Sequence, residues 1–254
     1  MHRYQILIEY VGTNFIGWQI QPKGKSIQKL IQTKLSKLLR EKILLIGSGR
    51  TDSGVHAIEQ SAHFECKKEI QNLDKFLKSL NHFVNDMNVS IINIKKRNIN
   101  FHARFSAKER IYKYVIFNRF SRPSIEKERG WHIIKELDIS LMKRGAKKLL
   151  GTKDFSTFRS SSCNALSPIK TMKSIKIKSF RGKIEIQFRS QSFLQQQVRS
   201  MVGCLKYLAE KKWDLKKFNS VFKSKKRTLC APPAPAEGLF LSLIHISEPT
   251  RRTP

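Results

Sequence analysis

Residues Gly49–Ala57 read GRTDSGVHA, and the apolar stretches on either side of them decide the fold prediction. Ile43–Ile46 is long enough for one buried strand, and Ser61–Cys66 is short and partly alternating, which suits a second strand. The block between them is polar and bounded by glycines, and loops that join strands often carry functional side chains. The sequence therefore predicts a strand, a site-bearing loop and another strand.

The loop holds an acid and a base close together in sequence. Arg50 and Asp52 are two positions apart, so in an extended segment both side chains leave on the same face. A guanidinium in that position can orient the carboxylate and keep it ionised. Gly54 is expected to allow a positive φ or the close approach of a substrate. A simpler interpretation is a tight turn in which Asp52 only caps backbone amides.

The elements around this loop predict a first unit of order β-α-β-β-α-β, the ferredoxin-like arrangement. Phe15 and Trp18, in the loop Gly12–Gln21, are expected to be exposed. Besides the two strands already named, the expected elements are a strand at Tyr4–Val11, a helix capped by Ser26 and running through Arg40, a helix at Asp74–Phe83 and a strand at Val89–Ile94.

A second, similar set of elements follows and predicts an α+β fold of two ferredoxin-like units, with largely antiparallel sheets and helices on one face. We expect domains at 1–100 and 101–246, and a foreign or disordered tail at 247–254. The expected elements of the second unit are strands at Arg110–Asn118, Thr171–Ser179, Lys183–Arg189 and Gly238–Ile244, and helices at Asp138–Leu150 (capped by Asp138), Phe193–Lys211 and Leu215–Phe222.

The charge balance indicates a polyanionic partner. The 254 residues include 50 Lys and Arg against 19 Asp and Glu, a formal net charge of +31. Such a surplus attracts polyanions over long range, and RNA is the commonest one available to a folded domain. A lysine bias of the whole proteome is an alternative source of the excess, and the two explanations are compatible.

Other patterns argue against several protein classes. The four cysteines are widely spaced without a C-x-x-C pair, which suits free thiols in a reducing cytosol, and the seven histidines show no metal-ligand spacing. No apolar run approaches transmembrane length, and the N-terminus lacks a signal-peptide pattern. We expect a soluble cytoplasmic protein without a metal and without a membrane partner.

Residues Phe101–Asn118, FHARFSAKERIYKYVIFN, form a second candidate site. Strand alternation places Arg110, Tyr112 and Tyr114 on one face. A basic and aromatic face of this kind can stack a splayed base and hold its phosphate. The alternative is a half-buried strand whose tyrosines belong to the core.

Several blocks of the chain resemble the signatures of the TruA family of tRNA pseudouridine synthases. The resemblance covers roughly Tyr4 to Ile244, and the family's invariant aspartate falls on Asp52. The blocks are Gly17–Gln19 (GWQ), GRTDSGVHA, the R-x-Y-x-Y core at Arg110–Tyr114, Asp154–Arg159 (DFSTFR), Phe193–Gly203 (FLQQQVRSMVG) and Ala234–Phe240 (APAEGLF).

The resemblance implies a pseudouridine synthase fold and roles for individual residues. Tyr112 would stack on the target uracil, and Arg199 would reach the catalytic pocket and pair with the aspartate. It also implies a homodimer that acts on the anticodon stem-loop of tRNA, at positions 38 to 40.

The implied reaction explains why one carboxylate suffices. Conversion of uridine to pseudouridine breaks the N1–C1′ bond, turns the uracil and joins C5 to C1′, so neither electrons nor phosphates are exchanged and no cofactor is required. Asp52 would attack C1′, or take the ribose 2′ proton to give a glycal. The target base must be flipped out, and Arg50 is placed to help fill the gap that it leaves or to hold the flipped nucleotide. A non-catalytic RNA-binding protein is the alternative hypothesis, and simple RNA binding does not require the Arg50–Asp52 pair.

Overall fold

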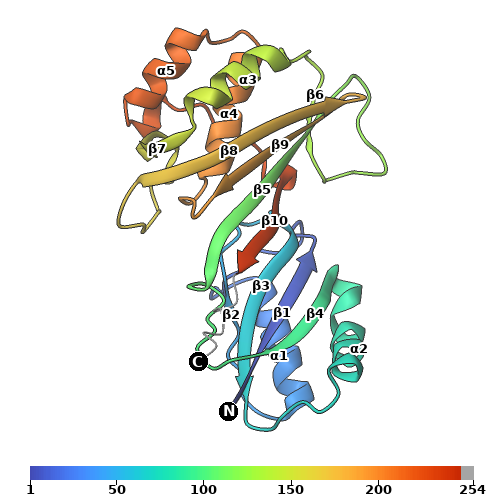
Figure 1. Cartoon of the computed structure of the whole chain (residues 1–254). Coiled ribbons are helices and arrows are strands. Elements are labelled where there is room, and N and C mark those ends of the chain that lie inside the picture. The colour runs from blue at the N-terminus through green and yellow to red at the C-terminus, as the bar shows by residue number, and fades with distance from the viewer. Residues whose placement is uncertain (247–254) are drawn as a thin grey trace, which may run out of the picture. The chain divides into compact units, whose positions relative to one another are not determined.

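The structure is a computed structural model that describes residues 1–246, and the chain divides into two compact units (Figure 1). Unit 1 comprises Met1–Glu109 together with the chain from Leu241, and unit 2 comprises Arg110–Phe240. Both crossings between the units fall inside strands. The domain limits 1–100 and 101–246 stay a prediction, and the expected tail at 247–254 lies outside the described residues.

Unit 1 has the predicted β-α-β-β-α-β order. Its sheet runs β4-β1-β3, with β10 (Leu239–Ile246) beside β3, and β1 is antiparallel to both β3 and β4. The short β2 is antiparallel to β3. This arrangement is the predicted antiparallel ferredoxin-like sheet. The elements are β1 (His2–Tyr10), α1 (Ile27–Leu39), β2 (Ile46–Gly47), β3 (His56–Cys66), α2 (Leu73–Val84) and β4 (Val89–Arg97).

The core of unit 1 follows from the alternation of β1 and the helical spacing of α1. Tyr4, Ile6 and Ile8 share one face of the strand and are fully buried. The buried side chains of α1 recur at three- and four-residue spacing, at Ile27, Ile31 and Leu35. Ser26 accepts a hydrogen bond from the backbone N of Lys29, which confirms the predicted N-cap.

The predicted strand at Ile43–Ile46 is wrong for most of its length, because only Ile46 and Gly47 form a strand. Polar side chains on one face of α1 form hydrogen bonds with the backbone of residues 43–45, which lie directly before β2. These bonds satisfy the backbone groups that a neighbouring strand would otherwise satisfy. The three bonds run from Gln28 Nε2 to Leu45 O (2.8 Å), from Leu45 N to Gln32 Oε1 (3.1 Å) and from Ile43 N to Ser36 Oγ (3.0 Å).

Unit 2 has a sheet of order β5-β9-β8-β7, with helices on one face (Figure 1). The pairs β5–β9, β9–β8 and β8–β7 are antiparallel, and the three-residue β6 is parallel to β5. β6 and β7 were not predicted, since both are too short for a clear alternation. The elements are β5 (Ala107–Asn118), β6 (Trp131–Ile133), α3 (Ile139–Lys148), β7 (Gly151–Asp154), β8 (Ile169–Phe180), β9 (Lys183–Ser190), α4 (Gln197–Ala209) and α5 (Leu215–Lys223).

Helix α4 begins four residues later than the predicted Phe193. Gln196, which precedes it, has a φ of 61°, a left-handed conformation that a helix cannot include. The side chain of Gln197 turns back and accepts a hydrogen bond from Leu194 N at 2.8 Å. By contrast, Asp138 caps α3 as predicted, with its carboxylate accepting from Leu141 N at 2.8 Å.

None of the helices in residues 1–246 is both long and apolar enough to cross a membrane.

Candidate active site

The loop that carries Asp52 is held by the segment that follows β1. Trp18 N donates to Thr51 O at 3.1 Å, and Gly54 N donates to Phe15 O at 3.4 Å. Asp52 O accepts from Val55 N at 3.2 Å, which closes a turn over Ser53 and Gly54. The Asp52 side chain is half-buried. Main-chain bonds therefore restrain the backbone on both sides of the acid, while its side chain keeps part of its surface accessible.

Glycines make this close approach of two segments possible. Gly17 has a φ of +112°, and a Cβ there would lie 2.6 Å from Thr51 O and 3.2 Å from the carbonyl carbon of Asp52. A Cβ on Gly12 would lie 2.0 Å from Val55 O. Gly54 has a φ of +77°, which confirms the predicted positive dihedral. The loop conformation thus depends on the absence of side chains at Gly12 and Gly17.

Buried polar side chains fix both ends of the loop. Tyr10 Oη and Thr51 Oγ1 are 2.8 Å apart, and Gly12 N donates to His56 Nδ1 at 3.0 Å. Because this Nδ1 accepts a hydrogen bond, the neutral ring of His56 carries its proton on Nε2. At the other end, Gln60 Nε2 donates to Gly49 O at 2.8 Å. The loop is therefore a preorganised part of unit 1.

The prediction that Phe15 and Trp18 are exposed is wrong. Their side chains are 6% and 3% exposed, respectively. The Trp18 ring lies 6.2 Å from the Tyr10 ring and covers Gly47, where a Cβ would meet the indole at 2.5 Å. Trp18 packs closely against β2 because Gly47 has no side chain there.

Arg50 does not hold the Asp52 carboxylate in this structure. Its side chain is exposed, and within residues 1–246 no ion pair joins it to Asp52. The turn of the loop lies after Asp52, over Ser53 and Gly54. The guanidinium is instead accessible to a ligand.

The other predicted site residues, Arg110, Tyr112 and Arg199, belong to unit 2. Arg110 and Tyr112 lie on β5, and both contact the segment after β9. An Arg110 guanidinium nitrogen donates to Gln191 O at 2.6 Å. The half-buried Tyr112 ring meets the Phe193 ring edge-on, with centroids 5.1 Å apart. The block Phe193–Gly203 thus contributes an aromatic ring that packs against the Tyr112 ring.

Tyr114 is a core residue and not part of an exposed stacking face. It is 0% exposed, and its Oη donates to Pro235 O at 2.8 Å. Burial raises the pKa of its phenol well above the usual range. A Cβ on Gly238 would lie 2.5 Å from the Tyr114 ring. The alternative interpretation of a core tyrosine is therefore correct for Tyr114, which anchors the closing segment Ala234–Phe240.

Arg199, on α4, is joined to the same closing segment. Its Nε donates to Ala234 O at 2.7 Å, and its backbone O accepts from Ala234 N at 3.0 Å. One turn further along α4, a Cβ on Gly203 would lie 2.1 Å from Pro232 O. Helix α4 and the segment Pro232–Ala234 are therefore in backbone contact, and this contact sets the direction of the Arg199 side chain.

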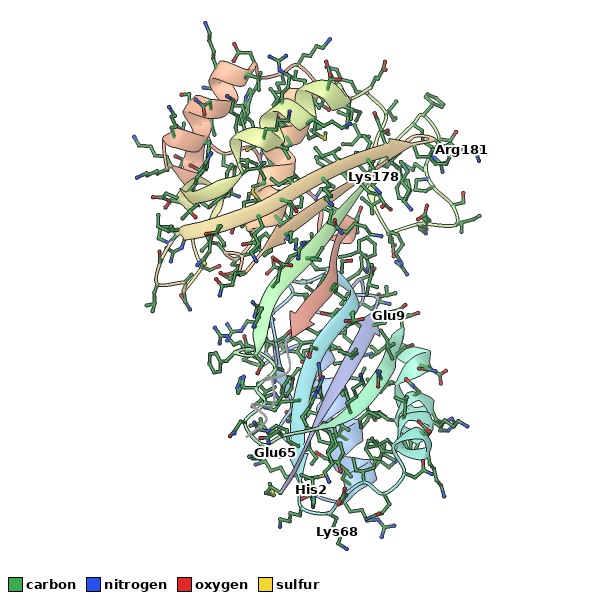
Figure 2. All side chains as sticks on the ribbon, viewed as in Figure 1. His2, Glu9, Glu65, Lys68, Lys178 and Arg181 are labelled. Atoms are coloured by element: carbon green, nitrogen blue, oxygen red, sulfur yellow. The ribbon has the colours of Figure 1, made fainter. Side chains whose placement is uncertain are left out.

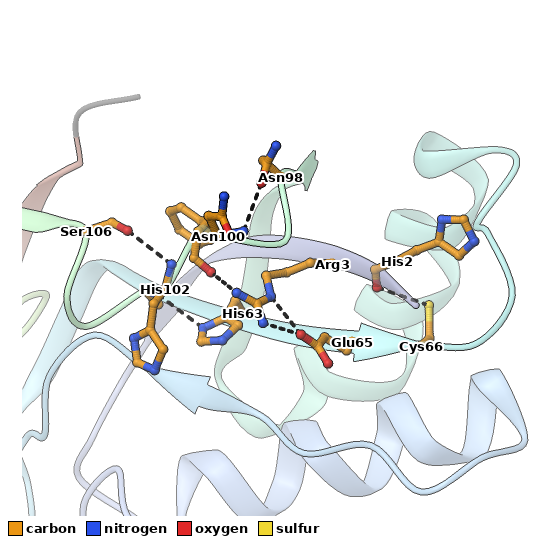
Figure 3. A network of polar contacts seen from close by, with 11 residues as sticks. His2, Arg3, His63, Glu65, Cys66, Asn98, Asn100, His102 and Ser106 are labelled. Carbon is orange, nitrogen blue, oxygen red and sulfur yellow. Dashed lines mark hydrogen bonds and ion pairs between the residues drawn. The ribbon is translucent and has the colours of Figure 1, made fainter. Parts of the chain in front are cut away.

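The turn before β5 is tied to β1 and β3 by a polar network (Figure 3). Arg3 forms an ion pair with Glu65 and donates to Phe101 O. His63 Nδ1 accepts from Ala103 N at 3.2 Å. Burial, with repulsion from His102 and Arg3, lowers the pKa of His63 from 6.5 to about 4, so this ring is neutral. The network fixes the start of the stretch Phe101–Asn118 within unit 1.

Exposed lysines and arginines occur on the strands, turns and helices of unit 2. Arg181 lies at the β8–β9 turn and Lys178 lies near the end of β8 (Figure 2), and Lys173 and Lys176 are also exposed on β8. No group of three or more His, Cys, Asp or Glu side chains suited to a metal occurs in the part of the chain that the structure describes. The charge suits a polyanionic ligand.

Comparisons with known proteins identify close relatives. A family model described as tRNA pseudouridine synthase matches residues 6–106 and 146–245. The tRNA pseudouridine synthase A of Pelagibacter ubique (strain HTCC1062) is 79% identical over 96% of this chain and 99% of its own length. The enzymes of the same name from Maricaulis maris (strain MCS10) and Parvibaculum lavamentivorans are 36% and 37% identical, over 98% and 95% of this chain and 100% and 98% of their own lengths. A solved chain of a Cbf5-Nop10-Gar1 complex, 10% identical with a TM-score of 0.35 over 80% of this chain and 53% of that chain, is too distant to support an argument.

Proposed function

This chain belongs to the tRNA pseudouridine synthase family, and from that premise we propose that it modifies uridines in the anticodon stem-loop of tRNA, at positions 38 to 40, with Asp52 acting on the ribose. The enzymes are isomerases that convert uridine in tRNA to pseudouridine. The observation that supports the role of Asp52 is its position in a loop whose backbone is hydrogen bonded on both sides. Such restraint places a reacting group before the substrate arrives.

The carboxylate of Asp52 acts at the sugar in one of two ways. As a nucleophile it attacks C1′, an ester forms between Asp52 and C1′, and the N1–C1′ bond breaks; as a base it removes the proton at C2′, the N1–C1′ bond breaks, and a glycal forms. In both cases the uracil turns and C5 bonds to C1′; this step breaks the Asp52–C1′ ester in the nucleophilic route and returns the proton to C2′ in the glycal route. N1 gains a proton, and the C5 proton leaves through Asp52 or Tyr112. Uridine carrying deuterium at C2′ distinguishes the two, because only the glycal route breaks that bond and slows with the heavier isotope.

The remaining site residues bind the flipped nucleotide. Tyr112 stacks on the target uracil and Arg199 provides the cation of the pocket, as the family resemblance implies. Two further arginines contact the RNA backbone. They are Arg50, which is exposed near Asp52, and Arg110, near the start of β5. Two steps of this assignment are supported by geometry, since Phe193 supports Tyr112 and Ala234 orients Arg199.

The net charge of +31 and the exposed cations of β8 support tRNA as the partner. We further propose a cytoplasmic homodimer, as the family resemblance implies. A molar mass in solution equal to that of a single chain would contradict the dimer.

The decisive experiment compares the wild-type protein with Asp52→Asn on tRNA labelled with tritium at uridine C5. Loss of the reacting carboxylate is expected to lower tritium release by roughly four orders of magnitude. Asp86→Asn, at an exposed acid of unit 1, is the control and should turn over normally. Retention of tritium release by Asp52→Asn overturns the assignment. Tight tRNA binding without tritium release by the wild-type protein points to a non-catalytic RNA-binding protein.

A further inference from the structure

Two cysteines of unit 2 lie together although they are far apart in sequence. The sulfur atoms of Cys204 and Cys230 are 3.4 Å apart, and both residues are free thiols. Cys204, on α4, is 1% exposed, whereas Cys230, directly after the short helix Arg227–Leu229, is half-buried. A disulfide bond is about 2.05 Å long, so the sulfurs need to approach by only about 1.4 Å.

The surroundings make Cys230 the more reactive of the two thiols. A hydrogen bond from Cys204 and the positive charge of Arg227 lower the pKa of Cys230 against the effect of burial. Donation of that hydrogen bond, together with burial, raises the pKa of Cys204. Thiolates are the nucleophiles of thiol chemistry, so a thiolate at Cys230 faces a thiol at Cys204.

We propose that Cys204 and Cys230 are a reversible oxidation site, at which a hydroperoxide converts the two thiols to a disulfide. In the first step the Cys230 sulfur attacks an oxygen of the peroxide: an S–O bond forms, the O–O bond breaks, and hydroxide or an alkoxide leaves. In the second step the Cys204 sulfur attacks the Cys230 sulfur, the S–S bond forms and water leaves with the Cys204 proton. The two thiols lose two electrons, and the peroxide gains them.

The disulfide would act at the contact that orients Arg199. Cys230 leads directly into the segment Pro232–Ala234, which is packed against α4 at Gly203 and bonded twice to Arg199. Drawing Cys230 toward α4 shifts this segment and, with it, the acceptor of the Arg199 guanidinium. Oxidation is therefore expected to lower turnover reversibly; this consequence rests on the proposed function, whereas formation of the disulfide does not.

Formation of the bond is tested on the reduced full-length protein treated with hydrogen peroxide and digested with trypsin without reductant. The expected product is a linked pair of the peptides 200–206 and 228–251, which separates on reduction. Cys163→Ser is the matched control. As at Cys230, the surroundings lower the pKa of the Cys163 thiol: backbone hydrogen bonds and Arg159 outweigh the effect of burial. Unlike Cys230, Cys163 has no second cysteine sulfur in contact with it. The pair should form in Cys163→Ser and be absent from Cys230→Ser. Its absence from oxidised wild-type protein, or links made through Cys66 or Cys163 instead, overturns the proposal.

Activity provides a second, separate measurement. Tritium release by the oxidised wild-type enzyme should fall by about tenfold or more and return with a reductant, while Cys230→Ser should be unaffected by peroxide. Full turnover of an enzyme shown to contain the disulfide overturns the coupling to Arg199. A reduced wild-type enzyme that releases no tritium contradicts the proposed function, and the peptide analysis is independent of that result.

Discussion

Substitution of Gly17 by alanine tests whether the position of Asp52 depends on the segment after β1. The new Cβ would lie 2.6 Å from Thr51 O and 3.2 Å from the carbonyl carbon of Asp52. Carbon and oxygen atoms without a bond stay more than 3 Å apart, so the Thr51–Asp52 peptide must move by roughly half an ångström. Both contacting atoms are backbone, and neither can be relieved by a side-chain rotation.

Two effects of this substitution can be estimated separately. A misplacement of 1 Å at a reacting group costs on the order of a hundredfold in rate, so half of that predicts a loss of roughly tenfold in kcat. The φ of +112° adds backbone strain, and strain of this kind costs about 1–3 kcal/mol. For a chain of this size each kcal/mol lowers Tm by about 2–4 °C.

The assay is tritium release at saturating tRNA, together with thermal unfolding followed by circular dichroism. Gly151→Ala is the matched control: its φ is +91°, but no atom lies within 4 Å of the new Cβ, so it introduces the strain without the displacement. Both variants should lose several degrees in Tm, and only Gly17→Ala should lose turnover. Equal kcat values for Gly17→Ala and wild type, at a comparable loss of Tm, would refute the reasoning.

Two further predictions concern stability. Tyr114→Phe removes the hydrogen bond to Pro235 O, which should cost about 1–2 kcal/mol and lower Tm by a few degrees; an unchanged Tm would show that this bond contributes nothing. The second follows from His63, whose pKa falls from 6.5 to about 4 on folding, so the unfolded chain takes up a proton near pH 6.5 that the folded protein does not. The stability contributed by the neutral ring is complete above pH 6.5 and is lost as the pH falls from 6.5 to about 4. Tm should therefore drop less between pH 7 and pH 4.5 in His63→Gln than in wild type, and parallel curves would contradict the prediction.

Local signals predicted the regular elements well. Ser26 and Asp138 cap helices as expected, because a side-chain oxygen before an apolar repeat satisfies a free backbone amide wherever the helix packs. The strand expected at Ile43–Ile46 failed for a non-local reason. Ile43 and Leu45 are indeed buried, but side chains of α1 provide the hydrogen bonds that a neighbouring strand would have provided.

Features of the site were predictable where they depend on a residue's own backbone or charge. They were not predictable where they depend on contact with a residue distant in sequence. The positive φ of Gly54 follows from its place in a tight turn. The burial of Trp18 depends on Gly47, and the burial of Tyr114 depends on Pro235 and Gly238. No pattern in one sequence reveals such pairings. The same holds for Cys204 and Cys230, which sequence spacing alone would keep apart.

The contacts that restrain Asp52 indicate which residues of the site position this carboxylate and which do not. The loop around the acid is restrained by main-chain hydrogen bonds and by glycine contacts, and not by the neighbouring guanidinium. Backbone restraints of this kind keep the carboxylate in place without substrate. Arg50 is therefore not needed to hold the loop in its conformation. An exposed arginine next to a preorganised acid can then follow a polyanion as it binds. The sequence motif joins the two residues, but in the structure the backbone around Asp52 is restrained without any contribution from Arg50.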